Sequence, residues 1–357
     1  MVNKKPAGEG SWLSNTLVRE IFSQQLRMIG RSLTNEVRSK RFPLSFARLL
    51  NQALRAPGKL LSSQVMQGDL LSERDLRLWA TLALLAAIAP SGAQATPLPD
   101  LPPSLWRRAR AAAAAAEFLG VALDVIDDIQ DGDSPFVQHI GVPIALNIGL
   151  ALLELASLTL GKARKAGWPD PIADKALEVL HSEVLTSLGG QFLDLRFERE
   201  RSVTEAQIIE MTQKKSGTLL ALVCRIGAMA GMAADQERPA DYFETASLFG
   251  WYLGMWSQLL NDLHDAEVAQ TQREKSDRQR GKKTLPLVLE ERGILENILE
   301  PAEQWSPHTQ TAFSYTYVSA EIFRLRAQKT LRALEERFGP HPLLWPLTEH
   351  HPTTNVL

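Results

Sequence analysis

Long apolar segments with helical spacing limit the possible folds of this chain more than any other feature. Residues 107–131 read RRARAAAAAAEFLGVALDVIDDIQD, with six consecutive alanines at 111–116. Alanine has the highest helix propensity, so this segment predicts a long helix. Similar helical segments follow at 205–233, 243–268 and 315–338. We find no convincing run of alternating β-branched residues bounded by turn residues, so we expect an all-α protein.

The helices are expected to form one domain over residues 21–340. Residues 1–20 are expected to be a flexible N-terminus and residues 341–357 a loosely packed tail rich in Pro and His. The proline-rich residues 91–103 are expected to form a loop insertion, and the charged residues 268–284 a second loop. Neither an internal repeat nor a shift in composition indicates a further domain.

Charge and cysteine content exclude several classes of protein. The chain has 357 residues and carries 39 Lys+Arg against 41 Asp+Glu, a net charge of -2. A nucleic-acid binder would need clustered positive charge to bind phosphates, so we expect no nucleic-acid partner. The single cysteine, Cys224, cannot form an internal disulfide and leaves no Cys-based zinc site. A reducing compartment such as the cytoplasm is the simplest expectation.

One apolar segment is long enough to be mistaken for a membrane span. Residues 140–160 read IGVPIALNIGLALLELASLTL and include Pro143, Asn147 and Glu154. A span needs roughly 20 residues with few polar breaks. We therefore expect a buried helix of a large helical core and no transmembrane segment. The first fifteen residues lack the apolar run of a secretory signal.

Acidic side chains gather near the end of the alanine-rich helix. Asp127 and Asp131 are four residues apart and share one helix face, with Asp128 beside them and Asp124 one turn earlier. Like charges at this spacing destabilise a helix, and the apolar neighbours argue that the helix is buried. A hard cation such as Mg²⁺, which binds carboxylates, waters and substrate phosphates, would offset the repulsion. The alternative is a solvated acidic helix end.

A second acidic cluster repeats this spacing. Residues 258–265 read QLLNDLHD, so Asn261, Asp262 and Asp265 follow the pattern of the first cluster. Two such clusters facing each other across a helical bundle could hold metal ions between them and so bind a diphosphate. Three lysines could supply further positive charge: Lys215, Lys275 and Lys282.

In these residues the chain resembles the trans-isoprenyl diphosphate synthases, the polyprenyl synthetase family, over roughly residues 70–340. The two acidic clusters look like the family's two aspartate-rich motifs. Between and after them, GGQFLDL, KSGTLLAL and DRQRGKKTLP resemble three further elements of the family. These elements, with the residue that precedes the second cluster and a further lysine, identify Gln191, Asp194, Lys215, Gln258, Lys275 and Lys282.

The resemblance implies an isoprenoid synthase fold, a homodimer and a large cavity that holds an allylic isoprenyl diphosphate. It further implies three Mg²⁺ ions held by Asp127, Asp128, Asp131, Asn261, Asp262 and Asp265. Gln191, Gln258 and the three lysines would bind diphosphate, with Asp194 in support. The prenyl tail would pass Ala122 and Leu123, where small or non-aromatic residues leave room for a C15 to C20 chain or longer.

The departures from the family concern the second substrate, isopentenyl diphosphate. The family's early basic motif has only poor matches here, at residues 57–59 or at Arg74 and Arg77. Residues 131–147 contain no Lys or Arg, and His139 is the one candidate cation there. The acceptor is therefore isopentenyl diphosphate or a different molecule.

Three alternatives to chain elongation stay open. The prenyltransferases that modify a tryptophan of bacterial pheromone peptides resemble this chain in their arginine-free stretch and in a Leu-Asn pair like 146–147. A terpene cyclase would need no second diphosphate site, but Asp265 and Ala269 do not fit the usual cyclase motif. A regulatory subunit of a heteromeric synthase could also have lost these arginines.

Overall fold

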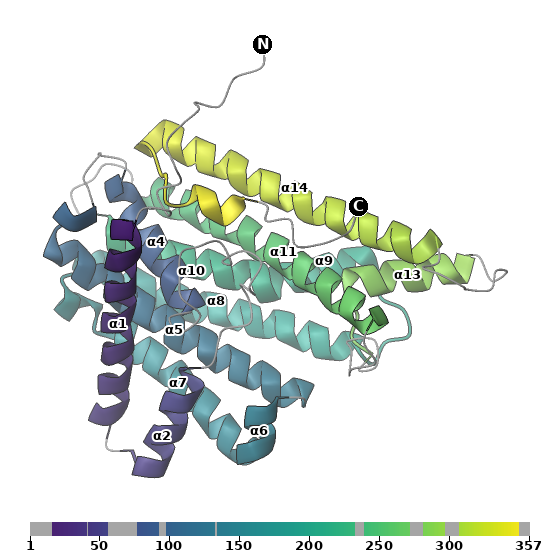
Figure 1. Ribbon diagram of the computed structural model, residues 1–357, viewed down its shortest axis with the longest axis horizontal. Helices are drawn as coiled ribbons and strands as arrows, with labels where there is room; N and C mark the ends of the chain where they lie inside the picture. The colour runs from purple at the N-terminus through teal and green to yellow at the C-terminus, as the bar shows by residue number, and fades with distance from the viewer. Residues whose placement is uncertain are drawn as a thin grey trace.

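The computed structural model describes residues 16–40, 42–55, 77–92, 98–132, 134–232, 239–271, 281–296 and 307–349. The elements are α1 (Thr16–Ser39), α2 (Leu44–Ala53), α4 (Leu78–Gly92), η2 (Leu98–Asp100), α5 (Pro103–Asp131), α6 (Pro135–Ile140), α7 (Val142–Gly161), η3 (Ala163–Ala166), α8 (Asp170–Phe197), α9 (Glu205–Thr212), η4 (Gln213–Gly217), α10 (Thr218–Gly231), α11 (Pro239–Thr271), α13 (Leu285–Glu296), α14 (Pro307–Phe338) and η5 (Trp345–Thr348). The described residues contain no strand, so the all-α prediction is confirmed (Figure 1).

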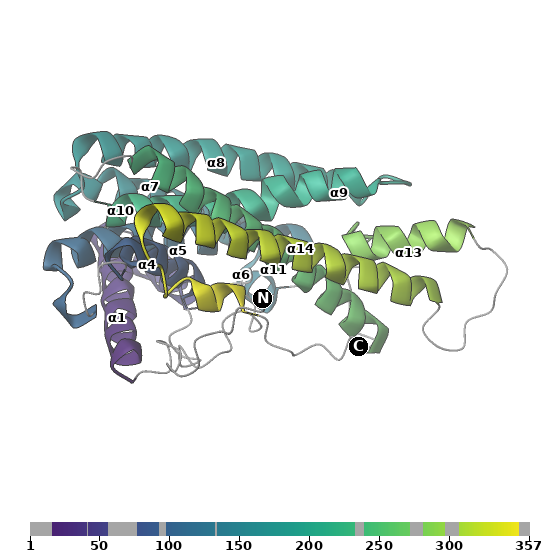
Figure 2. The same ribbon diagram turned by 90° about the horizontal axis from the view of Figure 1, so that it is seen from above.

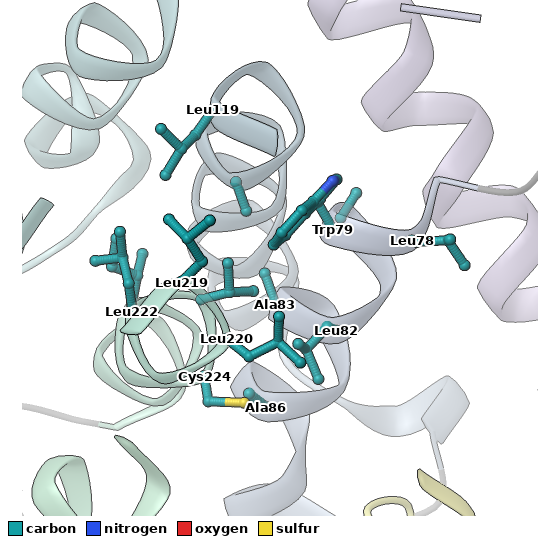
Figure 3. Close-up of a cluster of buried hydrophobic side chains, with 14 of the residues drawn as sticks. Leu78, Trp79, Leu82, Ala83, Ala86, Leu119, Leu219, Leu220, Leu222 and Cys224 are labelled. Atoms are coloured by element: carbon teal, nitrogen blue, oxygen red, sulfur yellow. The ribbon is translucent and has the colours of Figure 1, made fainter. Parts of the chain in front are cut away.

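Helix α5 lies inside the bundle and packs against α4, α7 and α10. Its alanines from 112 to 116 are all buried, and this short side chain lets neighbouring helices approach closely. Figure 3 shows part of the resulting core, where leucines of α10 meet Trp79 and small residues of α4. Helix α10 in turn packs on α11, and α11 on α14, which forms one edge of the molecule (Figure 1).

The ends of several elements differ from the sequence-based expectations. Helix α1 begins at Thr16, so residues 16–20 are helical where we expected a flexible N-terminus. The expected loop insertion at 91–103 is shorter, because α4 continues to Gly92 and residues 98–100 form a 3-10 turn.

The C-terminal residues 341–349 pack closely, contrary to the loose tail that we expected. His341 is fully buried, and its Nε2 lies 3.0 Å from the hydroxyl of Tyr242 on α11. Burial lowers the pKa of His341. The indole of Trp345 donates to the Glu335 carboxylate at 2.9 Å. Pro and His residues suggested disorder, but buried aromatic contacts and hydrogen bonds fix this segment to α11 and α14.

Helix α7 has one buried face and one exposed apolar face. Seven of its residues, spaced from Ala145 to Leu160, are buried, consistent with its packing on α5. Val142, Ile144, Leu146, Leu150 and Leu158 are exposed. By length and composition alone α7 could cross a membrane, as could many core helices. The expectation of a buried core helix is therefore correct for the face of α7 that packs on α5 and wrong for the opposite face.

Candidate active site

The first acidic cluster lies on the last two turns of α5. The helix ends where Gly132 adopts a left-handed conformation, with φ of +71°, and its N–H bonds the carbonyl of Asp128. Glycine adopts this conformation without steric cost, so the helix ends directly after the cluster. Asp127 and Asp131 thereby remain on regular helix and share a face.

Lys215 joins the end of α5 to α8. Its ammonium lies 2.6 Å from Oδ2 of Asp194 and 3.3 Å from Oδ1 of Asp127. Burial alone would lower the pKa of Lys215, but the two carboxylates outweigh it and raise the pKa above its usual value. Gln191, one turn before Asp194, donates to Asp127 at 3.1 Å and to Gln130 at 2.7 Å. The structure thus brings Asp127, Gln191, Asp194 and Lys215 together.

A single π-helical turn, η4, places Lys215 at this position. Wider π turns interrupt α-helices at many functional sites. Glycines on both neighbouring helices allow the close approach. A Cβ on Gly190 of α8 would lie 2.4 Å from the backbone nitrogen of Lys215. A Cβ on Gly254 of α11 would lie 2.5 Å from the backbone carbonyl oxygen of Ser216. Real side chains do not tolerate such distances, so α8 and α11 can meet the turn only through glycine.

The second cluster reaches the same turn from α11. The buried hydroxyl of Ser216 donates to Oε1 of Gln258 at 2.7 Å, and Nε2 of Gln258 donates to Oδ1 of Asp262 at 2.8 Å. Because Ser216 follows Lys215, the two motif helices are connected through adjacent residues of one turn. Asp262 is buried, Asn261 is half-buried and Asp265 is exposed.

Lys282 is a second lysine that contacts the first acidic cluster. It precedes α13, and its ammonium lies 3.0 Å from Oδ2 of Asp131. Asp128 is half-buried on the neighbouring face and takes part in further polar contacts. Lys275, the third predicted lysine, lies outside the described residues.

The ligand atoms at this site suit one mode of metal binding. The acidic clusters offer mainly oxygen atoms, which Mg²⁺ prefers over nitrogen or sulfur. Within the described part of the chain, no three Asp, Glu, His or Cys side chains form a group that could hold a metal ion alone. The residues therefore fit an ion that shares its coordination between one or two carboxylates and a bound phosphate, rather than an ion enclosed by protein.

The predicted tail residues lie deeper along α5. Ala122 is fully buried, and Leu123 is half-buried beside the core. Helix α7 lies close at this level, since a Cβ on Gly149 would be 3.5 Å from the Ala122 carbonyl oxygen. Their role in lining a tail pocket stays a prediction.

Arg77 has a structural position that the sequence did not indicate. Its Nη1 donates to the Leu54 carbonyl at 2.9 Å and lies 3.7 Å from Oε1 of the buried Glu117. The backbone N–H of Ala80 donates to the other oxygen of Glu117. Burial raises the pKa of Glu117 to about 7, against the opposing effects of Arg77 and Ala80. Arg77 therefore connects α2, α4 and α5, and its poor match to a diphosphate-binding arginine stays a prediction.

Sequence reasoning missed the residues that orient the predicted ones. Ser216, Gln130 and the two glycines 190 and 254 have no chemistry that singles them out. The repeated small residues beside each motif, in GGQ and KSG, were the available signal for close helix contact.

The chain matches the sequence model of a known protein family. The model of the polyprenyl synthetase family matches residues 74–314, more than half of the chain. The chain therefore belongs to the polyprenyl synthetase family, which confirms the resemblance seen in its motifs.

Two curated relatives match the chain over shorter regions. Geranylgeranyl diphosphate synthase of Methanosarcina mazei is 31% identical over 142 residues, which is 39% of this chain and 42% of that protein. Tryptophan prenyltransferase ComQ of Bacillus subtilis subsp. natto is 29% identical over 152 residues, 42% of this chain and 43% of that protein. The matched region thus spans less than half of either relative.

Solved structures match over nearly the whole chain. Geranylgeranyl pyrophosphate synthetase from the archaeon Geoglobus acetivorans has a TM-score of 0.68 at 22% identity, over 94% of this chain and 99% of that one. A polyprenyl synthase from Caulobacter crescentus, solved with calcium and isoprenyl diphosphate, has a TM-score of 0.65 at 20% identity, over 96% and 100%. At this identity the matches establish the fold, which is the isoprenoid synthase bundle that the motifs implied.

Proposed function

We propose that this protein is a Mg²⁺-dependent prenyltransferase that ionises an allylic isoprenyl diphosphate. The observation that carries the proposal is the single turn at 215–216 that joins both acidic motifs. Lys215 binds Asp127 and Asp194 on one side, and Ser216 reaches Asp262 through Gln258 on the other. Family membership supports this activity, and the Caulobacter relative was solved with calcium and isoprenyl diphosphate.

The chain's own residues would hold the diphosphate by opposite charges. Asp127, Asp131 and Asp262 would carry Mg²⁺, with Asp128, Asn261 and Asp265 as further oxygen ligands. Bound Mg²⁺, three ions per site by the resemblance, would supply Lewis-acid neutralisation of the leaving group. Lys215 and Lys282 would exchange part of their present carboxylate contacts for phosphate oxygens, joined by Lys275, Gln191 and Gln258. Asp194 would keep Lys215 in place.

The reaction then consists of ionisation, bond formation and loss of a proton. The allylic C–O bond breaks, and its electron pair leaves with the diphosphate, whose charge the lysines stabilise. The π electrons of the acceptor form a new C–C bond to the allylic carbon. A C–H bond of the acceptor then breaks to restore its double bond, and the proton passes to an oxygen of the released diphosphate. A buried site is needed because water would capture the allylic cation.

The acceptor is the part of the proposal with two candidates. Arg77 is taken up by Leu54 and Glu117, and residues 131–147 supply no Lys or Arg. These features favour an acceptor without a diphosphate, such as the tryptophan of a peptide, and the likeness to ComQ supports that class. Isopentenyl diphosphate is the candidate of polyprenyl synthesis in isoprenoid biosynthesis, and the family match and the likeness to geranylgeranyl diphosphate synthases support it.

Two further readings receive less support. A terpene cyclase would use the same ionisation, but Asp265 and Ala269 depart from the usual cyclase motif. An inactive regulatory subunit would not need a lysine held between Asp127 and Asp194. The retained acidic positions and lysines therefore favour an active enzyme.

We also infer a homodimer in the cytoplasm. The exposed leucines and isoleucine of α7 lie on one of two helices that pack together, and Leu185, Leu188 and Phe192 are exposed on the other, α8. Apolar side chains on two adjacent helices suit a second copy of the chain. Light scattering should give twice the chain mass, and Leu150→Asp should reduce it to one chain mass; an unchanged wild-type monomer would contradict the dimer.

The proposed activity is tested by measuring diphosphate release. Geranyl, farnesyl and geranylgeranyl diphosphates are supplied with Mg²⁺, each with and without isopentenyl diphosphate and a tryptophan-containing peptide. Release with at least one of the three supports the enzyme, and the acceptor that increases it identifies the class of second substrate. A folded protein that releases no diphosphate under any of these conditions would leave the regulatory-subunit reading.

A further inference from the structure

Helix α14 has an apolar face that packs on nothing in the described structure. Tyr315, Val318, Ile322 and Leu325 are spaced three and four residues apart and have relative exposures of 45% to 56%. This spacing places them along one line of the helix, which we call the α14 stripe. Figure 1 shows α14 along the outer edge of the molecule, and Figure 2, which looks onto that edge, shows α14 nearest the viewer.

The core does not need the α14 stripe. A separate set of residues on the inner face of α14 is buried, and α14 packs against α11 and α13. This inner set includes Phe313, Ala320, Phe323, Ala327 and Leu331. At one end of the stripe, the Tyr315 hydroxyl donates to the Glu205 carboxylate at 2.6 Å. The apolar carbons of the stripe therefore remain available to a partner.

Basic side chains continue the stripe toward the end of the helix. Arg326, Lys329 and Arg332 are exposed, and among residues 326–336 the one exposed acid is Glu336. Glu321, beside the stripe, is held by Arg324 at 2.7 Å and so contributes little free negative charge. Arg332 lies over the Trp345 ring, 5.8 Å from its centroid, which adds an aromatic side chain close to the positive charges. An apolar line bordered by positive charge is complementary to a surface of apolar chains under anionic groups.

The size of the stripe distinguishes a lipid surface from a protein partner. Four half-exposed side chains present a few hundred Å², the size of a functional patch on a monomer. A stable protein interface needs about 800 Å² on each partner. A lipid surface has no such requirement, because each basic residue close to anionic headgroups adds attraction to the apolar burial.

We propose that the α14 stripe and its three basic residues dock the protein on the surface of an anionic lipid membrane. The helix would lie in the plane of the surface, with Val318, Ile322 and Leu325 in the boundary between headgroups and acyl chains. Arg326, Lys329 and Arg332 would contact the lipid phosphates. None of these residues belongs to the candidate active site, so the proposal stands or fails separately from the proposed function.

Co-sedimentation with vesicles tests the proposal on the full-length protein. Vesicles of equimolar phosphatidylcholine and phosphatidylglycerol should bind the wild-type protein at least about tenfold more tightly than vesicles of phosphatidylcholine alone. Ile322→Glu should weaken binding to the anionic vesicles about tenfold or more, and Lys329→Glu should do the same. Equal binding to both kinds of vesicle, or no loss in either variant, would overturn the proposal.

A matched control is available on α2. Helix α2, which begins at the exposed Leu44, lies at the opposite edge of the molecule from α14 in Figure 1, so Leu44→Glu changes an exposed apolar side chain away from the stripe and adds the same charge. This variant should bind like the wild type. Light scattering separates the remaining reading: a lower particle mass for Ile322→Glu than for the wild type would make the stripe a protein interface and overturn the lipid proposal, and an unchanged mass supports it.

Discussion

The two halves of the expected substrate site differ in what their basic side chains contact. On the allylic side, Lys215 and Lys282 are held against the carboxylates that would bind metal. On the side where a second diphosphate would be expected to bind, Arg77 contacts Glu117 inside the fold. The one basic side chain on α6 is the exposed His139. From these contacts we expect the described residues to bind one diphosphate and to bind a second only weakly.

This difference means that ionisation of the allylic diphosphate and transfer to the acceptor depend on separate groups of residues. A site that can stabilise one leaving diphosphate can form an allylic cation whatever molecule accepts it. The acceptor half can change its chemistry without affecting that step. A divergent family member could in this way retain the first reaction and acquire a new second substrate.

The largest expected effect comes from removing a carboxylate of either motif. Asp127→Ala and Asp262→Ala should each lower diphosphate release by about 100-fold to 1,000-fold, because each removes an expected metal ligand and one of the contacts that hold Lys215 or Gln258. Steady-state release with farnesyl diphosphate measures the effect. Asp174→Ala, which removes an exposed acid paired with Arg164, serves as the control and should be active. Wild-type turnover in either motif variant would show that the acidic clusters are not the site.

Isopentenyl diphosphate should bind weakly. Two missing charge-assisted contacts of roughly 1.5–3 kcal/mol each would weaken its binding by about 100-fold or more relative to a typical family member. Titration calorimetry in the presence of Mg²⁺ and an unreactive allylic analogue gives the dissociation constant. Tight binding in the micromolar range would remove the contrast between the two halves and favour ordinary chain elongation.

The length of the allylic chain should depend on the face of α5 one turn below Asp127. Ala122→Phe should shift the preferred substrate from C15 or C20 toward C10, because the aromatic ring would close the space for the tail. Release rates with the three allylic diphosphates measure the shift, and circular dichroism monitors folding, since a larger side chain in a packed core costs about 1–3 kcal/mol. Leu123→Phe, at a half-buried position, provides a second test. Folded variants with wild-type preferences would show that this face only packs against α7.

The smallest effect concerns stability on the structural side of the comparison. The pKa of Glu117 is raised to about 7 in the fold, from 4.5, so the folded state holds this proton more strongly than the unfolded state. The free energy of unfolding should therefore fall by up to about 3 kcal/mol as the pH rises from 4.5 through 7. Glu117→Gln should remove this part of the pH dependence in urea unfolding. An identical pH profile for both proteins would contradict a buried, protonated Glu117.

Helix content and the acid spacing within each motif were predictable from the sequence because both are local. Alanine content and apolar spacing predicted α5, and the repeated acid spacing predicted the two motifs that the structure connects through one turn. The details that make the connection were not predictable. The π turn at 213–217 and the close contacts at Gly190 and Gly254 depend on how three helices meet.

Errors occurred where tertiary contacts decide the outcome. The contacts of Arg77 could not be predicted, because a sequence shows a charge and not its partner. Buried Glu117 lies 40 residues away in the chain, and only the fold brings the two together. The tail at 341–349 was misjudged for the same reason, since His341 is buried by Tyr242 from a distant helix.

Adjacent lysines offer the most direct test of the claim that the turn at 215–216 carries the chemistry. Lys214 pairs with Glu210 on the solvent side, and the half-buried Lys215 lies between Asp127 and Asp194. Mg²⁺-dependent diphosphate release from farnesyl diphosphate should be lost by at least about 100-fold in Lys215→Ala and should be nearly unchanged in Lys214→Ala. Equal activity in the two folded variants would contradict the assignment of Lys215 to the diphosphate and with it the proposed site.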